Sequence, residues 1–275
     1  MTGGNWFKFH ESINVVLSGK PGKYTTGKDI ILEIIRLIGV DGALYRTLEF
    51  TGSTIQYLNM DDRFSMCNMA IEAGAKSGIV AYDDVTAEFL ADKTLAREAK
   101  LHYSDEDASY MQILEINVAN LEPVIAYPFL PSNGHSLTQA VTDNIKIDQA
   151  FIGSCTNGRL GDLKIAAQIL KGKRVHPDVR LIVTPATQRI AREATKAGYM
   201  DIIIDAGGVV SNPTCGACLG GYMGILGDNE VAISTTNRNF VGRMGSRSSK
   251  VYLANSAVAA ASAITGYITD PDTIK

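Results

Sequence analysis

Residues 151–159 read Phe-Ile-Gly-Ser-Cys-Thr-Asn-Gly-Arg, and this stretch decides the fold. An apolar strand runs into a turn that holds Cys155, and a helix is expected from Leu160. In open α/β sheets, the carboxyl end of a strand is where ligands bind. A thiol that precedes a helix also faces the positive end of the helix dipole, which favours the thiolate. Cys155 is therefore either a ligand at the sheet edge or a buried cysteine in a strand–helix turn.

A second thiol segment, Cys215-Gly-Ala-Cys218, follows Asn212-Pro-Thr later in the chain. Two thiols at this spacing can turn toward one metal. Half of a zinc site would require a second Cys-x-x-Cys or a histidine pair, and the four histidines are scattered without such spacing. A thioredoxin-like redox pair would sit at a helix start after a short βαβ lead-in. Spacing alone leaves zinc, redox and iron–sulfur chemistry open, and three thiolates suit a cubane cluster with one open iron.

Strands and helices are expected to alternate along the whole chain, which favours parallel sheets covered by helices. We predict an α/β protein of two doubly wound three-layer α/β/α domains, residues 1–130 and 131–275, joined by a turn-rich linker at Tyr127–Gln139. Thr26 is the expected N-cap of the first helix. Expected strands are 13–17, 45–50, 79–82, 113–118, 124–126, 145–152, 179–184, 202–204, 231–235 and 251–253; expected helices are 28–38, 61–76, 85–93, 160–171, 188–197 and 257–265.

The composition bounds the class of protein. The chain has 275 residues, 45% of them hydrophobic and 20% charged, with a formal net charge of -3. This charge gives no reason to expect a nucleic acid or an anionic membrane as partner, and no apolar run reaches the roughly 18 residues that span a bilayer. Four cysteines are too sparse for a secreted disulfide framework. The expected compartment is the reducing cytoplasm.

Two further segments carry candidate chemistry. The loop Thr236–Arg243 holds Arg238 and Arg243 among asparagines and glycine, where they can fork onto carboxylates or simply be solvated. Glu72 lies among small and apolar residues, so a partly buried carboxylate is expected there as an acid, a base or a hydrogen-bond acceptor. Cys67 is most simply a core residue.

These segments together resemble the aconitase superfamily, and within it the isopropylmalate dehydratase and homoaconitase branch. The resemblance covers essentially the whole chain, and its motifs are long and occur in the family's order. Four segments carry it: Cys-Asn-Met-Ala-Ile-Glu-Ala-Gly-Ala-Lys at 67–76, Gly-Ser-Cys-Thr-Asn-Gly-Arg at 153–159, Asn-Pro-Thr-Cys-Gly-Ala-Cys-Leu-Gly at 212–220 and Thr-Asn-Arg-Asn-Phe-Val-Gly-Arg at 236–243.

The resemblance implies a [4Fe-4S] cluster with one open iron, held by Cys155, Cys215 and Cys218 and not by Cys67. The implied reaction is a reversible dehydration and rehydration, in which the open iron acts as a Lewis acid and a base removes a proton from the neighbouring carbon. Leucine biosynthesis, through the isomerisation of 2- and 3-isopropylmalate, is the expected setting. Homoaconitase and a dimethylmalate-type dehydratase are the nearest alternatives, and a non-catalytic cluster- or zinc-binding relic is the rival from another class.

The same resemblance implies roles for five other residues. Glu72 is expected on the substrate side of the cluster, near the open iron. Asn68 and Asn237 are expected to line the cluster. Arg238 and Arg243 are expected to bind the carboxylates of a hydroxy-dicarboxylate or hydroxy-tricarboxylate substrate.

Family large subunits begin with a further domain whose His and Asp residues help protonate the leaving hydroxyl, and this chain is expected to start after it. The catalytic serine is expected on a swivelling domain, which in this branch is a separate small subunit. An apolar start at Trp6, Phe7 and Phe9 fits either a cut domain junction or a tucked-in edge strand.

We therefore predict little or no dehydratase activity for the purified chain alone, because the proton-donating residues and the serine base lie on other domains. Steady-state assays of the chain with isopropylmalate and no partner test this. A robust turnover number would contradict it.

Overall fold

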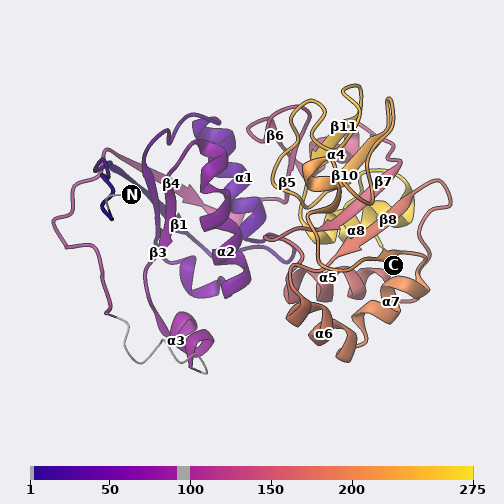
Figure 1. Ribbon diagram of the computed structural model, residues 1–275, viewed down its shortest axis with the longest axis horizontal. Coiled ribbons are helices and arrows are strands. Elements are labelled where there is room, and N and C mark those ends of the chain that lie inside the picture. The colour runs from indigo at the N-terminus through magenta and orange to yellow at the C-terminus, as the bar shows by residue number, and fades with distance from the viewer. Residues whose placement is uncertain (1–2, 92–99, 275) are drawn as a thin grey trace.

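The protein is described by a computed structural model that covers residues 3–91 and 100–274, and its helices and strands alternate as expected (Figure 1). The strands are β1 (Ser12–Ser18), β2 (Thr47–Thr51), β3 (Ser77–Val80), β4 (Gln112–Asn117), β5 (Val124–Ala126), β6 (Gly134–Ser136), β7 (Gln149–Gly153), β8 (Arg180–Thr184), β9 (Val209–Val210), β10 (Val231–Ser234) and β11 (Lys250–Leu253). The helices are α1 (Gly27–Ile38), α2 (Met60–Met69), α3 (Asp84–Leu90), α4 (Leu137–Thr142), α5 (Leu160–Leu170), α6 (Gln188–Lys196), α7 (Tyr199–Asp205) and α8 (Ser256–Thr265).

The first sheet of the described residues has four parallel strands in the order β3-β2-β1-β4. Its inner face is apolar, because alternate residues of β1 point to the same side: Ile13, Val15 and Leu17 are fully buried. Helices α1 and α2 cover this face. The outer face leaves Ile79 and Ile113 about half-exposed.

The second sheet of the described residues has seven strands in the order β6-β5-β11-β10-β7-β8-β9. The strands from β11 to β9 are parallel, and the hairpin β5–β6 joins antiparallel at one edge. Helices α5 and α8 pack against each other and lie over one face of the sheet. The α/β class with parallel sheets and helices is therefore confirmed.

Helix α1 lies between the two sheets, so that the two units share a helical layer (Figure 1). Ile30, Ile31, Leu32, Ile34 and Ile35 are all fully buried, so α1 has a broad apolar face, while Glu33 and Arg36 form an ion pair on its polar side. So broad an apolar face is stable only when other elements cover it. One apolar cluster accordingly contains side chains of α1, of the first sheet and of the inner face of the second sheet.

The beginning of α1 is tied to the second unit by polar contacts. Thr26 is the N-cap, as expected, and its N–H donates to Asp29 Oδ2 at 2.8 Å. Asp29 is fully buried, and its other oxygen accepts from Val124 N at 3.0 Å. Asn255, the N-cap of α8, donates its side-chain amide to Asp29 Oδ2 at 2.9 Å. The two units are thus joined through the ends of two helices.

Some expected elements differ from the structure. The strand expected at 202–204 is wrong, because these residues belong to α7 and the strand β9 follows at Val209. Three consecutive isoleucines favour a strand, but Met200 and Ile203, three residues apart, are buried on one side of a helix that packs against α5. Tertiary packing therefore overrides the local β preference.

The chain leaves the first sheet at β4 and enters the second at β5. The strand 124–126, which we expected in the first unit, therefore belongs to the second sheet, and the expected linker at Tyr127–Gln139 contains β6 and the start of α4. The division into two domains near residue 130 stays a prediction. The helix expected at 61–76 ends at Met69 and continues as a 3₁₀ turn, Ala70–Ala73. The end of the helix expected at 85–93 lies outside the described residues.

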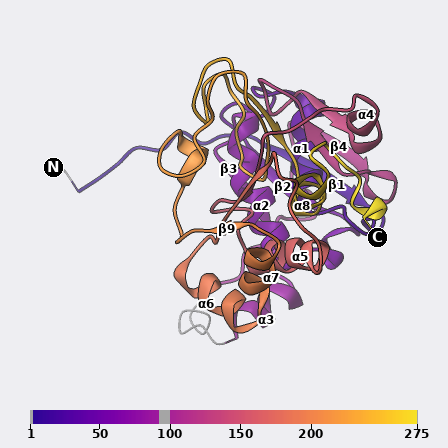
Figure 2. The same ribbon diagram turned by 90° about the vertical axis from the view of Figure 1, so that its right-hand side faces the viewer.

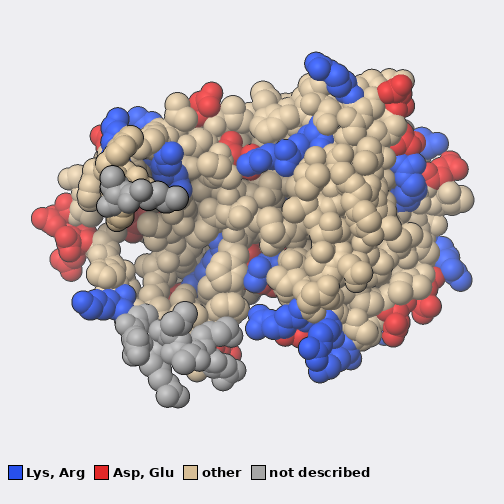
Figure 3. Space-filling model, viewed as in Figure 1, with Lys and Arg blue, Asp and Glu red and all other residues tan. Residues whose placement is uncertain are grey.

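The surface shows few single-sign regions. Acidic and basic side chains are mixed on the face drawn in Figure 3.

The N-terminal segment runs away from the body of the molecule (Figure 2), with Trp6 82%, Phe7 75% and Phe9 96% exposed, so it does not form the tucked-in edge strand. In the part of the chain that the structure describes, no helix is long and apolar enough to cross a membrane.

Replacing Asn255 with alanine is expected to lower the free energy of unfolding by about 2–4 kcal/mol, because it removes a helix cap and leaves buried Asp29 with fewer donors. Urea unfolding followed by circular dichroism measures this. Asn120→Ala is the matched control at an exposed asparagine and should stay within about 0.5 kcal/mol of wild type. Equal losses in the two variants would contradict the role of Asn255.

Candidate functional site

The candidate site lies at the carboxyl ends of β7 and β10, which are adjacent and parallel. The two loops that leave these strands are joined at their base. Gly153 N donates to Thr235 Oγ1 at 2.8 Å, and the same hydroxyl donates to Gly153 O at 2.8 Å. Further out, Thr156 Oγ1 donates to Asn237 Oδ1 at 2.6 Å. The Cys155 loop and the arginine loop are therefore held side by side.

The turn that presents Cys155 has an unusual backbone. Ser154 has a φ of 109°, a region that side chains other than glycine rarely adopt. Gly153, with a φ of 158°, packs so closely that a Cβ atom would lie 2.5 Å from Thr184 O. Strain of this kind clusters at functional sites. Its result here is that the Cys155 thiol is exposed while both neighbouring residues are buried.

The other two cysteines flank a short 3₁₀ turn, Gly216–Leu219, in which Cys218 N donates to Cys215 O at 3.0 Å. Cys215 is exposed, Cys218 is half-buried, and neither forms a disulfide. Burial raises the pKa of Cys155, and the nearby thiols of Cys218 and Cys215 raise it further. The three thiols therefore interact electrostatically across the two loops.

This donor set fits an iron–sulfur cluster better than a single ion. Among residues 3–91 and 100–274, no group of three His, Cys, Asp or Glu side chains is arranged to hold a metal ion. In a cubane cluster each thiolate binds its own iron, so the thiols need to surround a cage and not to converge on one point. Three free thiols that repel each other as thiolates suit a cationic group between them.

The first unit contributes Asn68 and Glu72 to the same place. Glu72, in the 3₁₀ turn after α2, is 6% exposed. Arg238 Nε lies 2.8 Å from Glu72 Oε1 and 3.0 Å from Oε2, and Asn237 Nδ2 donates to Asn68 Oδ1 at 3.1 Å. Burial raises the pKa of Glu72, although the neighbouring Arg238 opposes this. The structure thus brings together motifs that lie more than a hundred residues apart in the sequence.

Arg243 differs from Arg238 at its Nε, which in Arg238 contacts Glu72. The Nε of Arg243 is buried and has no hydrogen-bond partner within the described residues. A buried guanidinium N–H without an acceptor costs free energy, so this N–H is available to an acceptor such as a carboxylate. Cys67, by contrast, is half-buried, and burial raises the pKa of its thiol to about 11. This environment suits a core thiol and not a ligand.

Sequence reasoning missed the charged residues beneath the site. Lys28 is fully buried, and its ammonium donates to Thr236 O at 2.6 Å. Burial lowers the pKa of Lys28 to about 8. The carboxyl group of Asp162, at the start of α5, is also enclosed, and burial raises its pKa to about 7. The available signal was the pair Lys28-Asp29 directly before the apolar face of this helix.

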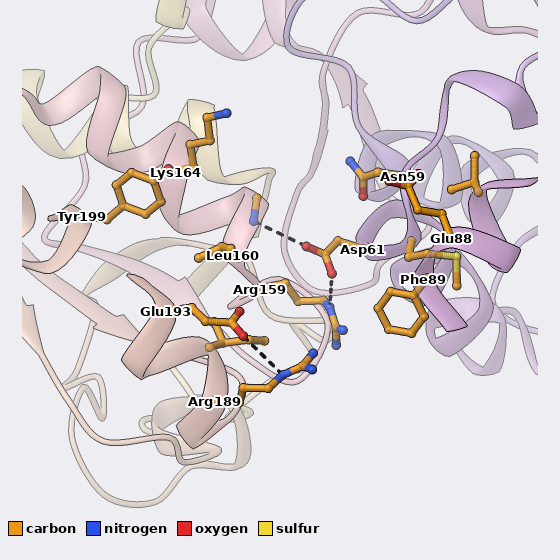
Figure 4. A pocket seen from close by; sticks show the side chains of 14 residues that line it. Asn59, Asp61, Glu88, Phe89, Arg159, Leu160, Lys164, Arg189, Glu193 and Tyr199 are labelled. Carbon is orange, nitrogen blue, oxygen red and sulfur yellow. Dashed lines mark hydrogen bonds and ion pairs between the residues drawn. The ribbon is translucent and has the colours of Figure 1, made fainter. Parts of the chain in front are cut away.

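A separate cavity of about 570 Å³ lies where α2 and α3 face α5 and α6 (Figure 4). Asp61 forms an ion pair with Arg159 across it, and Arg189 lies 3.6 Å from Glu193. Its lining contains none of the cysteines and none of the other residues predicted for the site. The cavity therefore plays no part in the chemistry considered below.

Comparison with known proteins decides the family. The family model described as "Aconitase family (aconitate hydratase)" matches residues 1–266. The chain belongs to the aconitase family. The resemblance read from the four motifs is thereby confirmed.

Curated members of the aconitase family are closely similar to this chain. A 3-isopropylmalate dehydratase large subunit of Sulfurimonas denitrificans is 85% identical over 271 residues, and one of Aliarcobacter butzleri is 75% identical over 276 residues. Each match covers 98% of this chain but 65% of the relative, so the chain spans about two thirds of their length. The solved structure of Thermococcus kodakaraensis aconitase X (holo-form) covers 84% of this chain and 49% of its own, with a TM-score of 0.44 and 14% identity, a likeness too weak to carry an argument.

Asp162 should make stability depend on pH. Its pKa is about 7 in the folded chain and about 4 when exposed, so between these values the folded state holds a proton that the unfolded state has lost. The free energy of unfolding that Asp162 contributes therefore falls as pH rises from about 4 to about 7. In Asp162→Asn this dependence should disappear.

Urea unfolding of wild type and Asp162→Asn at a series of pH values measures the effect, with exposed Asp201→Asn as the control. The curve of wild type should descend relative to that of Asp162→Asn as pH rises, while Asp201→Asn should follow wild type. Parallel curves for all three proteins would contradict the buried carboxyl.

Proposed function

We propose that this chain is the cluster-binding portion of the large subunit of a hydro-lyase that interconverts 2- and 3-isopropylmalate by dehydration and rehydration. The names of the close relatives support the substrate class. The observation that carries the proposal is the contact between Arg238 and Glu72, with Nε and Oε1 2.8 Å apart. This contact supports the proposal because Arg238 would bind a substrate carboxylate and Glu72 would hold a proton, beside the loops that carry the three thiols.

Cys155, Cys215 and Cys218 would hold a [4Fe-4S] cluster. When bound, the cluster supplies an open, Lewis-acidic iron that polarises the hydroxyl group to be removed. Asn68 and Asn237, which are hydrogen-bonded to each other, would line its substrate side. The [4Fe-4S] type of the cluster and the role of each residue are both part of the proposal.

The two arginines would bind and orient the substrate carboxylates. Arg238 uses Nε on Glu72, which leaves its two terminal amino groups for a carboxylate. Arg243 offers its buried Nε, which has no acceptor within the described residues. Two fixed guanidinium groups suit a dicarboxylate, because each carboxylate can be held separately and the carbon chain between them is thereby oriented.

Glu72 would hold or deliver a proton on the substrate side. Loss of a hydroxyl group as water requires a proton, and a carboxyl group with a raised pKa delivers one more readily near neutral pH. Arg238 keeps Glu72 oriented and limits how far its pKa rises. The base that takes the proton from the neighbouring carbon would come from a partner chain.

A small subunit with the swivelling domain is the proposed partner, since the relatives are named large subunits. The remaining third of the relatives' length would supply further groups around the substrate. We place the assembled enzyme in the cytoplasm.

Anaerobic reconstitution with iron and sulfide should give a brown protein. The chromophore should be lost when Cys155, Cys215 or Cys218 is replaced by serine, because each thiolate holds one iron. Cys67→Ser is the matched control and should keep the chromophore. Stoichiometric zinc without a chromophore would contradict the cluster.

Activity is tested on the complex of a large subunit carrying this segment with its small subunit. Glu72→Gln is expected to lower kcat by about 10²–10⁴-fold, the usual contribution of a general acid or base. Arg238→Ala should mainly raise KM for isopropylmalate. Unchanged binding of isopropylmalate in Arg238→Ala would favour a non-catalytic cluster protein, and faster turnover of homoaconitate would reassign the substrate.

A further inference from the structure

Lys28 is a buried cation that the proposed chemistry does not use. It lies in the first turn of α1, in the helical layer between the two sheets, and none of its side chain reaches solvent. Within the described residues, Lys28 has no carboxylate at ion-pair distance. A buried charge without an ion pair costs much free energy unless other groups compensate for it, so its presence requires an explanation.

The compensation comes from three acceptors around the ammonium group. Lys28 Nζ lies 2.6 Å from Thr236 O, 3.2 Å from Thr235 O and 3.3 Å from Met69 Sδ. A lysine ammonium has three N–H donors, so these three atoms account for all of them. Two acceptors belong to the second unit and one to the first.

Two of the three acceptors adjoin a residue of the candidate site. Thr236 directly precedes Asn237, and Met69 directly follows Asn68. On the outer side, Asn237 and Asn68 are themselves hydrogen-bonded at 3.1 Å. The segment that ends in Met69 and the segment that starts at Thr236 are therefore connected twice. Lys28 connects them on the buried side, and the hydrogen bond between Asn68 and Asn237 connects them on the outer side.

We propose that Lys28 is a positioning residue of this site: it fastens the loop that carries Asn237 and Arg238 to the helix end that carries Asn68 and Glu72. The chemical roles of the residues held in this way rest on the proposed function. The contacts by which Lys28 holds their two segments together do not.

A role in stability alone does not account for this arrangement. A methionine at this position would fill a similar volume without the cost of burying a charge, and apolar replacements of buried charges are often neutral or stabilising. The negative groups that favour the charged form of Lys28 include Cys218 and Glu72, which are residues of the site. The ammonium group of Lys28 therefore lies close enough to one thiol and one carboxylate of the site to interact with them.

Hydrogen exchange of the chain without a cluster tests the fastening. The amides of Thr235 and Arg243, which donate to Phe151 O and Phe240 O, report on the arginine loop. In Lys28→Met they should exchange about tenfold faster or more, the effect of losing hydrogen bonds to a charged group. Amides of β8 should exchange as in wild type. Lys28→Arg, which keeps the charge, should restore part of the protection.

Lys164→Met is the matched control, since Lys164 is an exposed lysine on α5, and it should leave all these amides unchanged. Unchanged exchange of Thr235 and Arg243 in Lys28→Met would overturn the proposal. Equal acceleration in β8 would also overturn it, because that result would make Lys28 a residue of general stability.

A second measurement separates this inference from the proposed function. In the reconstituted complex of a large subunit carrying this segment with its small subunit, isopropylmalate should alter the electron paramagnetic resonance signal of the reduced cluster, and Lys28→Met should weaken that response about tenfold while retaining the chromophore. If wild type itself shows no response to isopropylmalate, the proposed function fails, and the exchange data still decide the role of Lys28.

Discussion

The burial of α1 between two sheets is the constraint on which the rest of the structure depends. The broad apolar face of α1 must be covered by both sheets, and the polar side chains buried at its first turn must find partners in the neighbouring elements. Lys28 and Asp29 are the charged residues of that turn. Asp29 accepts from Thr26, Val124 and Asn255, and Lys28 donates to the strand end that leads into the arginine loop. The junction of the two units and the base of the site are therefore the same set of contacts.

Because these contacts join the two units, the site can be built from loops and helix ends of both units and not from one rigid helix or strand. The thiol loops leave the second sheet, whereas Asn68 and Glu72 come from a helix end of the first unit. Neither unit alone contains both Glu72 and Arg238, whose side chains contact each other. Their relative position is fixed by the shared helical layer, so packing far from any ligand sets distances at the site. The strained turn at Ser154 also positions a residue of the site through the backbone. It exposes the thiol of Cys155 while the neighbouring residues stay buried.

Much of the fold could be read from the sequence, because the alternation of apolar strands with helices is a local property. The turn after β7 was predicted from its glycine, its thiol and the helix that follows. The failures occurred where distant packing decides. Residues 202–204 have strand propensity but lie in α7, and 124–126 join the second sheet although they follow the first sheet in sequence. The family resemblance implies that Glu72 and Arg238 lie at one site, but it does not predict the contact between their side chains. Lys28 was missed because its acceptors are main-chain carbonyls, which have no signature in a sequence.

The contacts of Lys28 also bear on how the protein is made. Its acceptor Thr236 lies 208 residues further along the chain. At a translation rate of about 5–20 residues per second, α1 leaves the ribosome roughly 10–40 seconds before that acceptor exists. Until the second sheet forms, part of the apolar face of α1 therefore stays uncovered in the growing chain.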